Sequence, residues 1–297
     1  MYHNPVLLNQ CIEGLNIQPN GIYVDVTYGG GGHSKEILSM LDKGKLFGFD
    51  QDQDALANKL DDERLILINH NFRFLKNFLK YHGVLPVDGI LADLGVSSHQ
   101  FDVAERGFSL RFPGKLDLRM NQNQKLTAAV VLNEYDQDQL SSIFRNYGEL
   151  PNAWPISTAI IKFRSGRQLI NFEDLKQALS HFPIPGRENK FFAKVLQALR
   201  IEINQELEAL KEFLLQVPGV LKEGGRLVVI SYHSLEDRLV KNFTRSGNFE
   251  GQLEKDFFGN VETPFQLINK KPIVPDENEI SKNNRARSAK LRIAEKR

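Results

Sequence analysis

The sequence predicts an α/β fold in which a doubly wound, mostly parallel sheet carries an inserted helical subdomain. Up to Leu94, short apolar segments rich in β-branched residues alternate with amphipathic segments, and a glycine-rich turn joins the first such pair. From Arg106 to Gly186 the pattern is helical and contains no clear strand. Strands that alternate with helices imply a parallel sheet, and helices that run together inside such a pattern imply an insertion.

The N-terminal part of the chain contains four predicted strands, the first three each followed by a helix. The strands span 22–28, 46–50, 65–68 and 87–94, and the helices span 35–41, 54–60 and 74–81. In an open parallel sheet, ligands bind beyond the carboxyl ends of the strands. The glycine turn, Asp50, the loop 69–72 and the loop 93–98 are therefore expected to lie along one edge.

Helical patterns fill the insertion, and a return to the sheet follows it. The insertion holds predicted helices 127–133, 137–146, 153–165 and 172–181, and a long helix 190–216 leads out of it. A fifth strand, 226–231, has Gly224-Gly225 as its turn; helix 235–245, loop 247–259 and strands 266–268 and 289–293 complete the pattern. We expect one domain from residues 1–105 and 187–297, and a second from 106–186.

The composition excludes several classes of protein. The chain has 297 residues, of which 41% are hydrophobic and 25% charged, as in ordinary soluble globular proteins. Its net charge is +1, so any affinity for nucleic acid must come from local patches. No apolar run is long enough to span a membrane, and the N-terminus lacks the charge and apolar region of a signal peptide, which predicts a cytoplasmic protein without a membrane partner.

A glycine-rich turn, Gly29 to Gly32, follows the first strand and precedes a helix that begins near Ser34. A turn without side chains before a helix start lets a ligand lie against backbone N–H groups at the positive end of the helix. Asp50 closes the second strand, where an acidic residue accepts ribose hydroxyls in dinucleotide sites. A flexible hinge is the alternative, although hinges seldom separate a buried strand from a helix start.

Asp25 helps to choose between two cofactors. It lies in the strand before the turn, where it could face a ligand ammonium and would repel a pyrophosphate. A ribose acceptor together with a carboxylate for an amino group favours S-adenosylmethionine. The glycine spacing also fits a nicotinamide dinucleotide loosely, so this spacing leaves both cofactors open.

Asp93, Ser97 and Ser98 follow the fourth strand, where in a methyltransferase the acceptor atom meets the methyl group. An exocyclic amine is a poor nucleophile because its lone pair is delocalised into the ring. A carboxylate that accepts hydrogen bonds from the N–H groups of the amine draws the nitrogen toward tetrahedral geometry and later takes the proton. Asp93 is the best-placed acceptor, and a plain strand-ending turn is the alternative. Cys11, the one cysteine, lies in an apolar stretch and is expected to be a buried, inert thiol without a disulfide.

His233 precedes the helix after the fifth strand, at the same edge of the predicted sheet. Ser234 is predicted to be the N-cap, with Asp237 as its partner three residues on. His233 would then face the cleft, or it is incidental to a capped helix. Phe108 and Tyr232 are candidates for the apolar wall that a base turned out of its stack would need. The seven histidines lack the spacing of a zinc site, so no metal is expected.

Clustered basic residues indicate phosphate contacts on this nearly neutral chain. The tail contributes Arg285 and Arg287, whereas Lys296 and Arg297 are read as solvated charge. Further cations lie in and after the insertion: Lys162, Arg164, Arg167, Arg187, Lys190, Lys194 and Arg200.

Taken together, nine stretches resemble the bacterial ribosomal small-subunit RNA (cytosine-N4)-methyltransferase family, the MraW/RsmH type. They are His3-Asn4-Pro5-Val6-Leu7-Leu8, Gly31-Gly32-His33-Ser34, Asp93-Leu94-Gly95-Val96-Ser97-Ser98, Arg106-Gly107-Phe108-Ser109, Leu116-Asp117-Leu118-Arg119-Met120, Tyr147-Gly148-Glu149, Leu196-Gln197-Ala198-Leu199-Arg200-Ile201, Ser234-Leu235-Glu236-Asp237-Arg238 and Arg285-Ala286-Arg287-Ser288. They occur in order along nearly the whole chain. The resemblance implies a Rossmann-like class I fold and S-adenosylmethionine-dependent methylation of N4 of a cytidine in the decoding region of 16S ribosomal RNA.

The resemblance also implies roles for individual residues. The cofactor contacts would be Gly31, Gly32, His33, Asp50, Phe72, Asp93 and Gln100, with Phe72 stacked on adenine. Asp93, Ser97, Ser98 and His233 are the catalytic candidates, and Arg200, Arg285 and Arg287 the RNA contacts. Gln10, Lys115 and Asn284 depart from the family pattern, which puts local backbone and RNA contacts in doubt.

Two other functions stay open at this stage. A nicotinamide oxidoreductase would use a similar sheet, and it would respond to NAD(H) rather than to S-adenosylmethionine. An assembly factor without catalysis would bind ribosomal RNA through the insertion and the tail, although the intact glycine turn and Asp50 argue against it. The sequence leaves open whether the protein forms a homodimer and whether its partner is naked RNA or the small ribosomal subunit.

Overall fold

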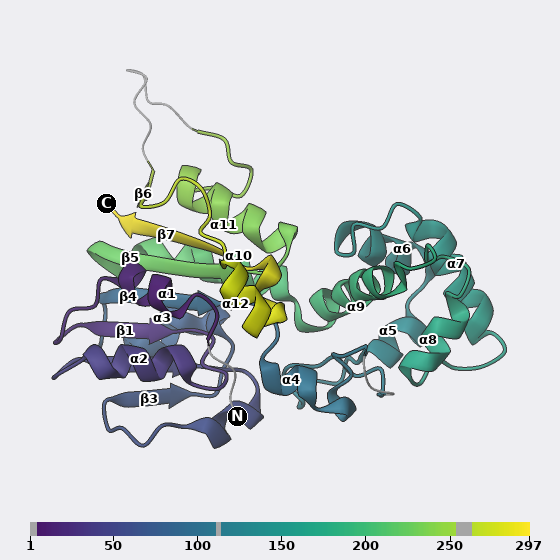
Figure 1. The fold of residues 1–297 in the computed structure, drawn as a ribbon, viewed down its shortest axis with the longest axis horizontal. Helices are drawn as coiled ribbons and strands as arrows, with labels where there is room; N and C mark the ends of the chain where they lie inside the picture. Colours follow the sequence, from purple (N-terminus) through teal and green to yellow (C-terminus); the bar gives the residue numbers. More distant parts are fainter. Residues whose placement is uncertain (1–4, 111–113, 254–262) are drawn as a thin grey trace. The chain divides into compact units, whose positions relative to one another are not determined.

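The computed structural model describes residues 5–110, 114–253 and 263–297. The chain forms two compact units (Figure 1). The sheet unit comprises Met1–Gly95 and Leu207–Arg297, and the helical unit comprises Val96–Glu206. Each is described by itself. Every helix in the described ranges is too short or too polar to cross a membrane.

The sheet unit is built on seven strands in the order β3-β2-β1-β4-β5-β7-β6. The strands are β1 (Ile22–Asp25), β2 (Lys45–Phe49), β3 (Leu65–Ile68), β4 (Val87–Asp93), β5 (Leu221–Ser231), β6 (Phe265–Leu267) and β7 (Lys290–Lys296). The first five pair in parallel, and β7 runs antiparallel between β5 and β6. The predicted doubly wound, mostly parallel sheet is confirmed.

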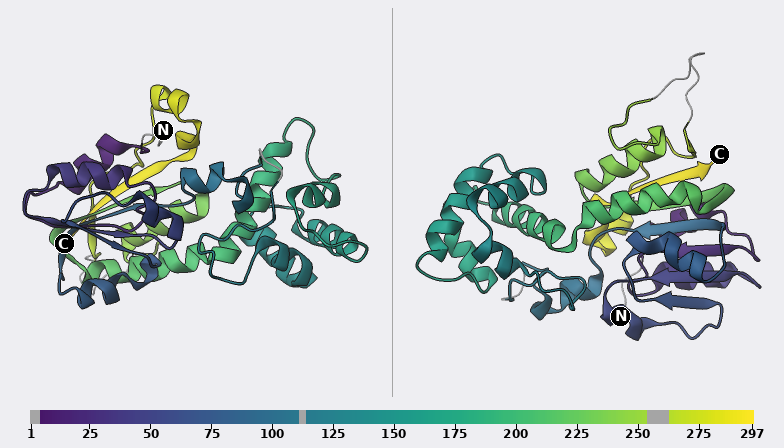
Figure 2. Two further views of the ribbon diagram at one scale, coloured as in Figure 1. Left: turned by 90° about the horizontal axis from the view of Figure 1, so that it is seen from below. Right: turned by 180° about the vertical axis from the view of Figure 1, so that it is seen from behind.

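Helices cover both faces of this sheet (Figure 2). One face packs against α1 (Leu8–Leu15) and α2 (Gly32–Met40). The other packs against α3 (Leu75–Tyr81), α10 (Glu206–Gln216) and α11 (Ser234–Ser246). Side chains alternate along each strand, so Tyr23 joins the first face and Val24 the second. Cys11 is fully buried on the first face, and burial raises the pKa of its thiol well above the usual value. This agrees with the prediction of a buried, inert thiol.

The C-terminal segment contacts Leu7, the residue before α1. It contains α12 (Glu277–Lys282) and a 3₁₀ turn, Asn284–Ser288, ahead of β7. The Leu7 N–H donates a 2.8 Å hydrogen bond to Oε1 of Glu279 on α12. Leu7 has a φ of 52°, a left-handed conformation in which this contact holds it. Leu7, just before α1, is thereby fixed to the C-terminal segment of the sheet unit.

The helical unit has its own apolar core. Its helices are α4 (Ser98–Asp102), α5 (Ala128–Glu134), α6 (Gln137–Asn146), α7 (Ala153–Arg164), α8 (Phe172–Ala178) and α9 (Glu188–Asn204). The predicted boundaries, 106 and 186, are too narrow, because α9 packs against α5 and α6 and belongs to this unit.

Three local predictions are wrong. The predicted helix 190–216 is two helices, because Gln205 adopts a left-handed φ of 51° between α9 and α10. The dipeptide Gly224-Gly225 lies inside β5, where the pairing with β4 shifts register between Val87 and Gly89, and is not a turn before it. The predicted helix 54–60 is a 3₁₀ helix, Gln53–Asn58.

Candidate active site at the carboxyl edge of the sheet

The carboxyl ends of β1, β2 and β4 lie side by side, because β1 pairs with both β2 and β4. The loop after β1 holds the glycine turn, Asp50 follows β2, and Asp93 ends β4. This carboxyl edge therefore brings together the turn and the two carboxylates that the sequence predicted would meet there.

The glycine turn leads into a helix whose first N–H groups have no side-chain cap in the described structure. Gly31 occupies the N-cap position of α2 with a φ of 73°, and no acidic residue lies in the first turn. Uncapped N–H groups at the positive end of a nine-residue helix favour an anionic or hydrogen-bond-accepting ligand.

Asp25, at the end of β1, stabilises the turn through hydrogen bonds to residues on either side of it. It is 1% exposed, accepts a 2.7 Å hydrogen bond from the Ser34 hydroxyl, and accepts a second from the Thr27 N–H at 3.1 Å. Burial raises the pKa of this carboxyl, while His33 and the hydrogen bonds oppose the rise. Asp25 thus supports the loop that it precedes, and the expectation that it faces a ligand ammonium is not met.

Asp50 joins the turn to the end of β2. Its Oδ2 accepts a 2.8 Å hydrogen bond from the Gly29 N–H, and its Oδ1 accepts one of 2.8 Å from the Asp52 N–H. Each carboxylate oxygen can accept a further hydrogen bond, which leaves capacity for two hydroxyl groups. Burial raises the pKa of Asp50 to about 6. The Asn69 amide donates to the Asp50 carbonyl at 2.9 Å and fixes the backbone there.

Asp93 is held on two sides. The Tyr232 hydroxyl donates to its Oδ1 at 2.8 Å, and Nδ1 of His33 lies 3.9 Å from its Oδ2. Its own N–H donates to Oγ1 of Thr27 at 2.6 Å. Burial raises the pKa of Asp93 to about 6, although His33 and Tyr232 both oppose the rise. With 24% of its side chain exposed, Asp93 is a reachable carboxylate of unusual basicity.

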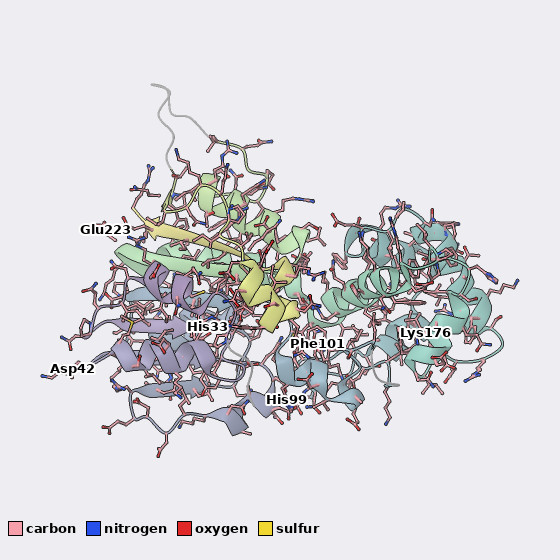
Figure 3. The ribbon with its side chains drawn as sticks, in the orientation of Figure 1. His33, Asp42, His99, Phe101, Lys176 and Glu223 are labelled. Carbon is pink, nitrogen blue, oxygen red and sulfur yellow. The ribbon has the colours of Figure 1, made fainter. Side chains whose placement is uncertain are left out.

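His33, labelled in Figure 3, is 7% exposed and sits between the residues before α1 and Asp93. Its Nε2 lies 3.0 Å from the Val6 carbonyl oxygen, which assigns the N–H to that nitrogen. Nδ1 is then the nitrogen that faces Asp93. The role of His33 as a cofactor contact stays a prediction, and its geometry places the ring beside the Asp93 carboxylate, 3.9 Å from Oδ2.

Phe72 lies just after β3, in the 3₁₀ turn Phe72–Phe74. It is partly buried and packs edge-on against Phe213 of α10 with ring centroids 5.5 Å apart. Its contact with the adenine stays a prediction.

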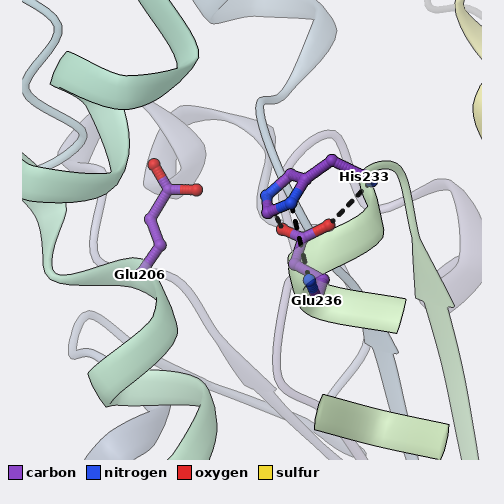
Figure 4. A group of neighbouring side chains, drawn as sticks. All are labelled: Glu206, His233 and Glu236. Atoms are coloured by element: carbon purple, nitrogen blue, oxygen red, sulfur yellow. Dashed lines mark hydrogen bonds and ion pairs between the residues drawn. The ribbon is translucent and has the colours of Figure 1, made fainter. Parts of the chain in front are cut away.

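His233 is the N-cap of α11, one residue earlier than the predicted cap at Ser234 (Figure 4). Its Nδ1 accepts from the Glu236 N–H at 3.5 Å, and its Nε2 lies 3.1 Å from Oε1 of Glu236. Glu236 accepts in turn from the Tyr232 N–H at 3.0 Å. Asp237 is not the cap partner; it pairs with Arg292 at 2.7 Å and with Lys290 at 3.3 Å.

We expect His233→Ala to lower the free energy of unfolding by about 1 kcal/mol, because it removes a cap. His233→Asn should restore most of this loss, since asparagine is among the best N-caps. Urea unfolding of the two variants measures both effects. An equal loss in both variants would show that the imidazole contributes something other than capping.

Three predicted residues belong to the start of α4 in the helical unit. The Ser97 hydroxyl accepts from the Gln100 N–H at 3.2 Å, and the Gln100 side chain accepts from the Ser97 N–H at 3.1 Å. Gln100 is 4% exposed. This capping box gives both side chains a structural role, and their predicted roles toward ligands remain predictions. The side chain of Ser98 lies outside the described part of the structure.

In the helical unit the prediction for Phe108 fails, while that for Arg200 stays a prediction that its contacts do not favour. Phe108 is 5% exposed within the apolar core, so it offers no open wall for a base. Arg200 forms a bidentate ion pair with Glu206, both distances being 2.8 Å, and its side chain is 14% exposed. Its guanidinium is therefore engaged and poorly placed for a phosphate. Of the tail residues, Arg287 is exposed and Arg285 partly so.

Three contributions to the site were missed from the sequence. They are the Thr27 hydroxyl under the Asp93 backbone, the Tyr232 hydroxyl on the Asp93 carboxylate, and the Val6 carbonyl that orients His33. Thr27 carried a signal, because it is a polar residue near the end of the predicted strand 22–28, just before the glycine turn. The other two depend on contacts between distant segments, which spacing along the chain does not reveal.

Gly31→Ala tests the turn. We expect the free energy of unfolding to fall by about 2–3 kcal/mol, because the residue has a positive φ and the new Cβ would lie 2.7 Å from the Tyr28 hydroxyl oxygen. Gly186→Ala is the matched control, since its φ is 77° and no atom lies within 4 Å of the new Cβ. Urea unfolding should show a smaller loss there, of about 1 kcal/mol; equal losses would contradict a close approach at Gly31.

The seven-stranded, mostly parallel sheet with a glycine turn and two carboxylates at its carboxyl edge is a Rossmann-like fold. Comparison with known proteins identifies the class as S-adenosylmethionine-dependent methyltransferases. All 297 residues match the model of the MraW methylase family, and the chain belongs to this family. It is 58% identical over 298 residues to a protein of Phocaeicola vulgatus, covering 100% of this chain and 98% of the relative. It is 60% identical over 292 residues to a protein of Flavobacterium psychrophilum, covering 98% and 100%. Both relatives are named ribosomal RNA small subunit methyltransferase H.

Among solved structures, the chain is similar to a putative methyltransferase of Streptococcus mutans in complex with SAH. The identity is 16%, the TM-score is 0.43, and the match covers 100% of both chains.

Proposed function

We propose that the carboxyl edge transfers the methyl group of S-adenosylmethionine to the exocyclic N4 amine of a cytidine in the decoding region of 16S ribosomal RNA. The observation that carries this function is the family match over the whole chain, with relatives named for methylation of small-subunit ribosomal RNA. Methylation of cytidine N4 is the activity that this name denotes. The predicted enzyme class and cofactor agree with the family, whereas a nicotinamide oxidoreductase does not.

The described residues fit this cofactor. The turn after β1 presents backbone N–H groups without a side-chain cap, and Asp50 keeps acceptor capacity for two ribose hydroxyls. Phe72 would stack on the adenine, and Gly31, Gly32 and His33 would line the turn. Asp93 and Gln100 complete the set that the family resemblance implies. When bound, S-adenosylmethionine supplies an electrophilic methyl group.

Asp93 is the proposed acceptor for the amine. Its carboxylate would accept an N–H of the cytidine amino group, localise the nitrogen lone pair and take the proton that leaves the nitrogen. A pKa of about 6 suits this task, because the group is ionised at neutral pH yet more basic than an ordinary aspartate. The Tyr232 hydroxyl holds Oδ1 by a 2.8 Å hydrogen bond, which leaves Oδ2 to accept from the amine. We propose that Ser97, Ser98 and His233 shape the pocket for the base and do not take the proton.

The helical unit and the tail are proposed to bind the RNA, and the small ribosomal subunit in the cytoplasm is the proposed setting. Arg285 and Arg287 follow α12 and precede β7. Arg287 is exposed, as a phosphate contact requires. A homodimer is compatible with this assignment, and sedimentation of the purified protein would reveal one.

Arg287→Ala is expected to weaken binding to 16S ribosomal RNA a few-fold and to reduce the slope of log K against log salt by about 0.7 to 0.9. Arg200→Ala should leave that slope unchanged, because its guanidinium is paired with Glu206. Filter binding at several salt concentrations measures both slopes. A reduced slope in Arg200→Ala alone would reverse the assignment.

The function is tested by incubating the protein with labelled S-adenosylmethionine and small ribosomal subunits from cells that lack the modification. The RNA is then digested, and its nucleosides are identified by mass spectrometry. Label in N4-methylcytidine is the expected result. Label in another nucleoside, or cofactor binding without transfer to any form of the RNA, would contradict the proposal.

A further inference from the structure

A short turn projects from the helical unit just before α9. The Arg187 N–H donates to the Ile184 carbonyl at 2.8 Å, with Pro185 and Gly186 between them. Proline followed by glycine at a φ of 77° is the signature of a type II turn. A Cβ on Gly186 would meet no atom within 4 Å, so the turn stands in open space.

Aromatic rings flank this turn and are backed by the apolar core. The rings of Phe182 and Phe191 are parallel to within 5°, with centroids 6.4 Å apart, and both are partly exposed. Phe191 also packs edge-on against Phe192, which is 6% exposed. Ile184 at the tip is 63% exposed. The result is an apolar, aromatic surface supported from beneath by buried side chains.

Positive charge accompanies these rings. Arg187 and Lys190 are exposed, and neither forms an ion pair with any residue that the structure describes. The neighbouring Glu188 is turned to the backbone, where its Oε1 accepts the Gly186 N–H at 3.0 Å, and hydrogen bonds to backbone N–H groups lower its pKa. Residues 181–191 therefore present two cations beside partly exposed rings, and Glu188, the acidic residue of this segment, is hydrogen-bonded to the backbone of the turn.

We propose that this aromatic turn, residues 181–191, binds an unpaired segment of ribosomal RNA by stacking a base on Phe191 or Phe182. Arg187 and Lys190 contact the adjoining phosphates. Aromatic faces combined with cations are how proteins hold single-stranded nucleic acid, because every base has a face to stack and every linkage has a charge. The choice of RNA as the occupant rests on the proposed function, and the two unpaired cations favour a polyanion over a neutral partner.

The test uses the full chain, a fluorescent 12-nucleotide single-stranded RNA, and the matching 12-base-pair RNA duplex. Two variants separate the two contributions: Phe191→Leu keeps an apolar side chain but removes the ring, and Arg187→Ala/Lys190→Ala removes only exposed charge. Lys43→Ala/Lys45→Ala, two exposed cations at the amino edge of the sheet unit, is the charge control. Ile170→Ala, 58% exposed in the helical unit, is the apolar control.

Phe191→Leu should raise the Kd for the single strand about 5- to 50-fold, leaving the Kd for the duplex and the salt slope unchanged. Arg187→Ala/Lys190→Ala should reduce the slope of log K against log salt for the single strand by about 1.4. This second variant removes only exposed side chains, so it tests the proposal even if Phe191→Leu impairs folding. The controls should match the wild type. The inference would be overturned if both variants kept the wild-type Kd for the single strand, or if they lost equal affinity for the single strand and the duplex. It would also be overturned if the wild type bound no RNA, or if this surface bound a protein partner instead.

Methyl transfer to small subunits is measured in parallel. If the wild type methylates the subunits while Phe191→Leu and Arg187→Ala/Lys190→Ala keep the wild-type Kd for RNA, the aromatic turn is wrongly assigned and the proposed function stands. If the wild type transfers no methyl group, the proposed function itself fails.

Discussion

Asp93→Asn lowers the rate of methyl transfer by about 10²- to 10⁴-fold, the usual contribution of a positioned general base. Asparagine keeps the size of the side chain and the contact with Tyr232, but it cannot take the proton that leaves the cytidine amine. Single-turnover assays with labelled S-adenosylmethionine measure the loss, and calorimetry shows whether cofactor binding persists. Asp88→Asn is the control at the opposite end of the same strand, where Asp88 accepts from the Ile22 N–H at 2.7 Å.

The pH dependence of the wild type follows from the same carboxylate. The ionised form is the acceptor and its pKa is about 6, so kcat/KM should fall as the pH drops below about 6. Tyr232→Phe removes a hydrogen bond that lowers this pKa, so the profile should move to higher pH. If the pH profile of Tyr232→Phe stays in place or moves to lower pH, the hydrogen bond from Tyr232 to Asp93 does not set the pKa that governs kcat/KM.

The stability of Asp93→Asn has a defined sign. Because the folded pKa lies above the ordinary value of 3.8, the folded state binds this proton more tightly than the unfolded chain. Stability from this group is therefore present below about pH 3.8 and is lost as the pH rises through about 6. At pH 8 the variant should melt no lower than the wild type, which separates a catalytic defect from misfolding.

Asp50→Ala should raise the Kd for S-adenosylmethionine by about 100-fold or more. Hydrogen bonds to a charged group contribute about 1.5–3 kcal/mol each, and the variant loses those to both ribose hydroxyls. It also releases the Gly29 N–H, which the carboxylate holds at 2.8 Å. Isothermal calorimetry measures the affinity.

Asp42→Ala, at an exposed position just after α2, is the matched control for Asp50→Ala and should bind the cofactor as the wild type does (Figure 3). Unchanged affinity in Asp50→Ala would sink the assignment of the cofactor to this edge of the sheet.

Most of the sheet was predictable because its strands are short apolar runs bounded by turn residues. The predicted strand 65–68 matches β3, and helix 137–146 matches α6. The break at Gln205 was missed because glutamine seldom adopts a positive φ, and here the buried Asn204 fixes the backbone by donating to the Leu118 carbonyl at 2.8 Å. Local pattern does not contain such a tertiary constraint.

The candidate site was predictable in part for the same reason. The glycine turn, Asp50 and Asp93 each lie at the end of a strand or just after it, so their position in the fold follows from their position in the sequence. The Tyr232 hydroxyl reaches Asp93 from 139 residues away, and the capping role of His233 depends on where α11 begins. These contacts depend on the packing of separate segments, which a spacing rule cannot supply.

The place of β7 between β5 and β6 constrains the order in which the protein can be completed during synthesis. Residues 265–267 leave the ribosome before residues 290–296, yet β6 has no strand to pair with until β7 arrives. Until then β5 has an open edge that can pair with other chains. A chain interrupted before residue 290 would therefore contain its glycine turn and both carboxylates but leave the edge of β5 unpaired and prone to aggregation.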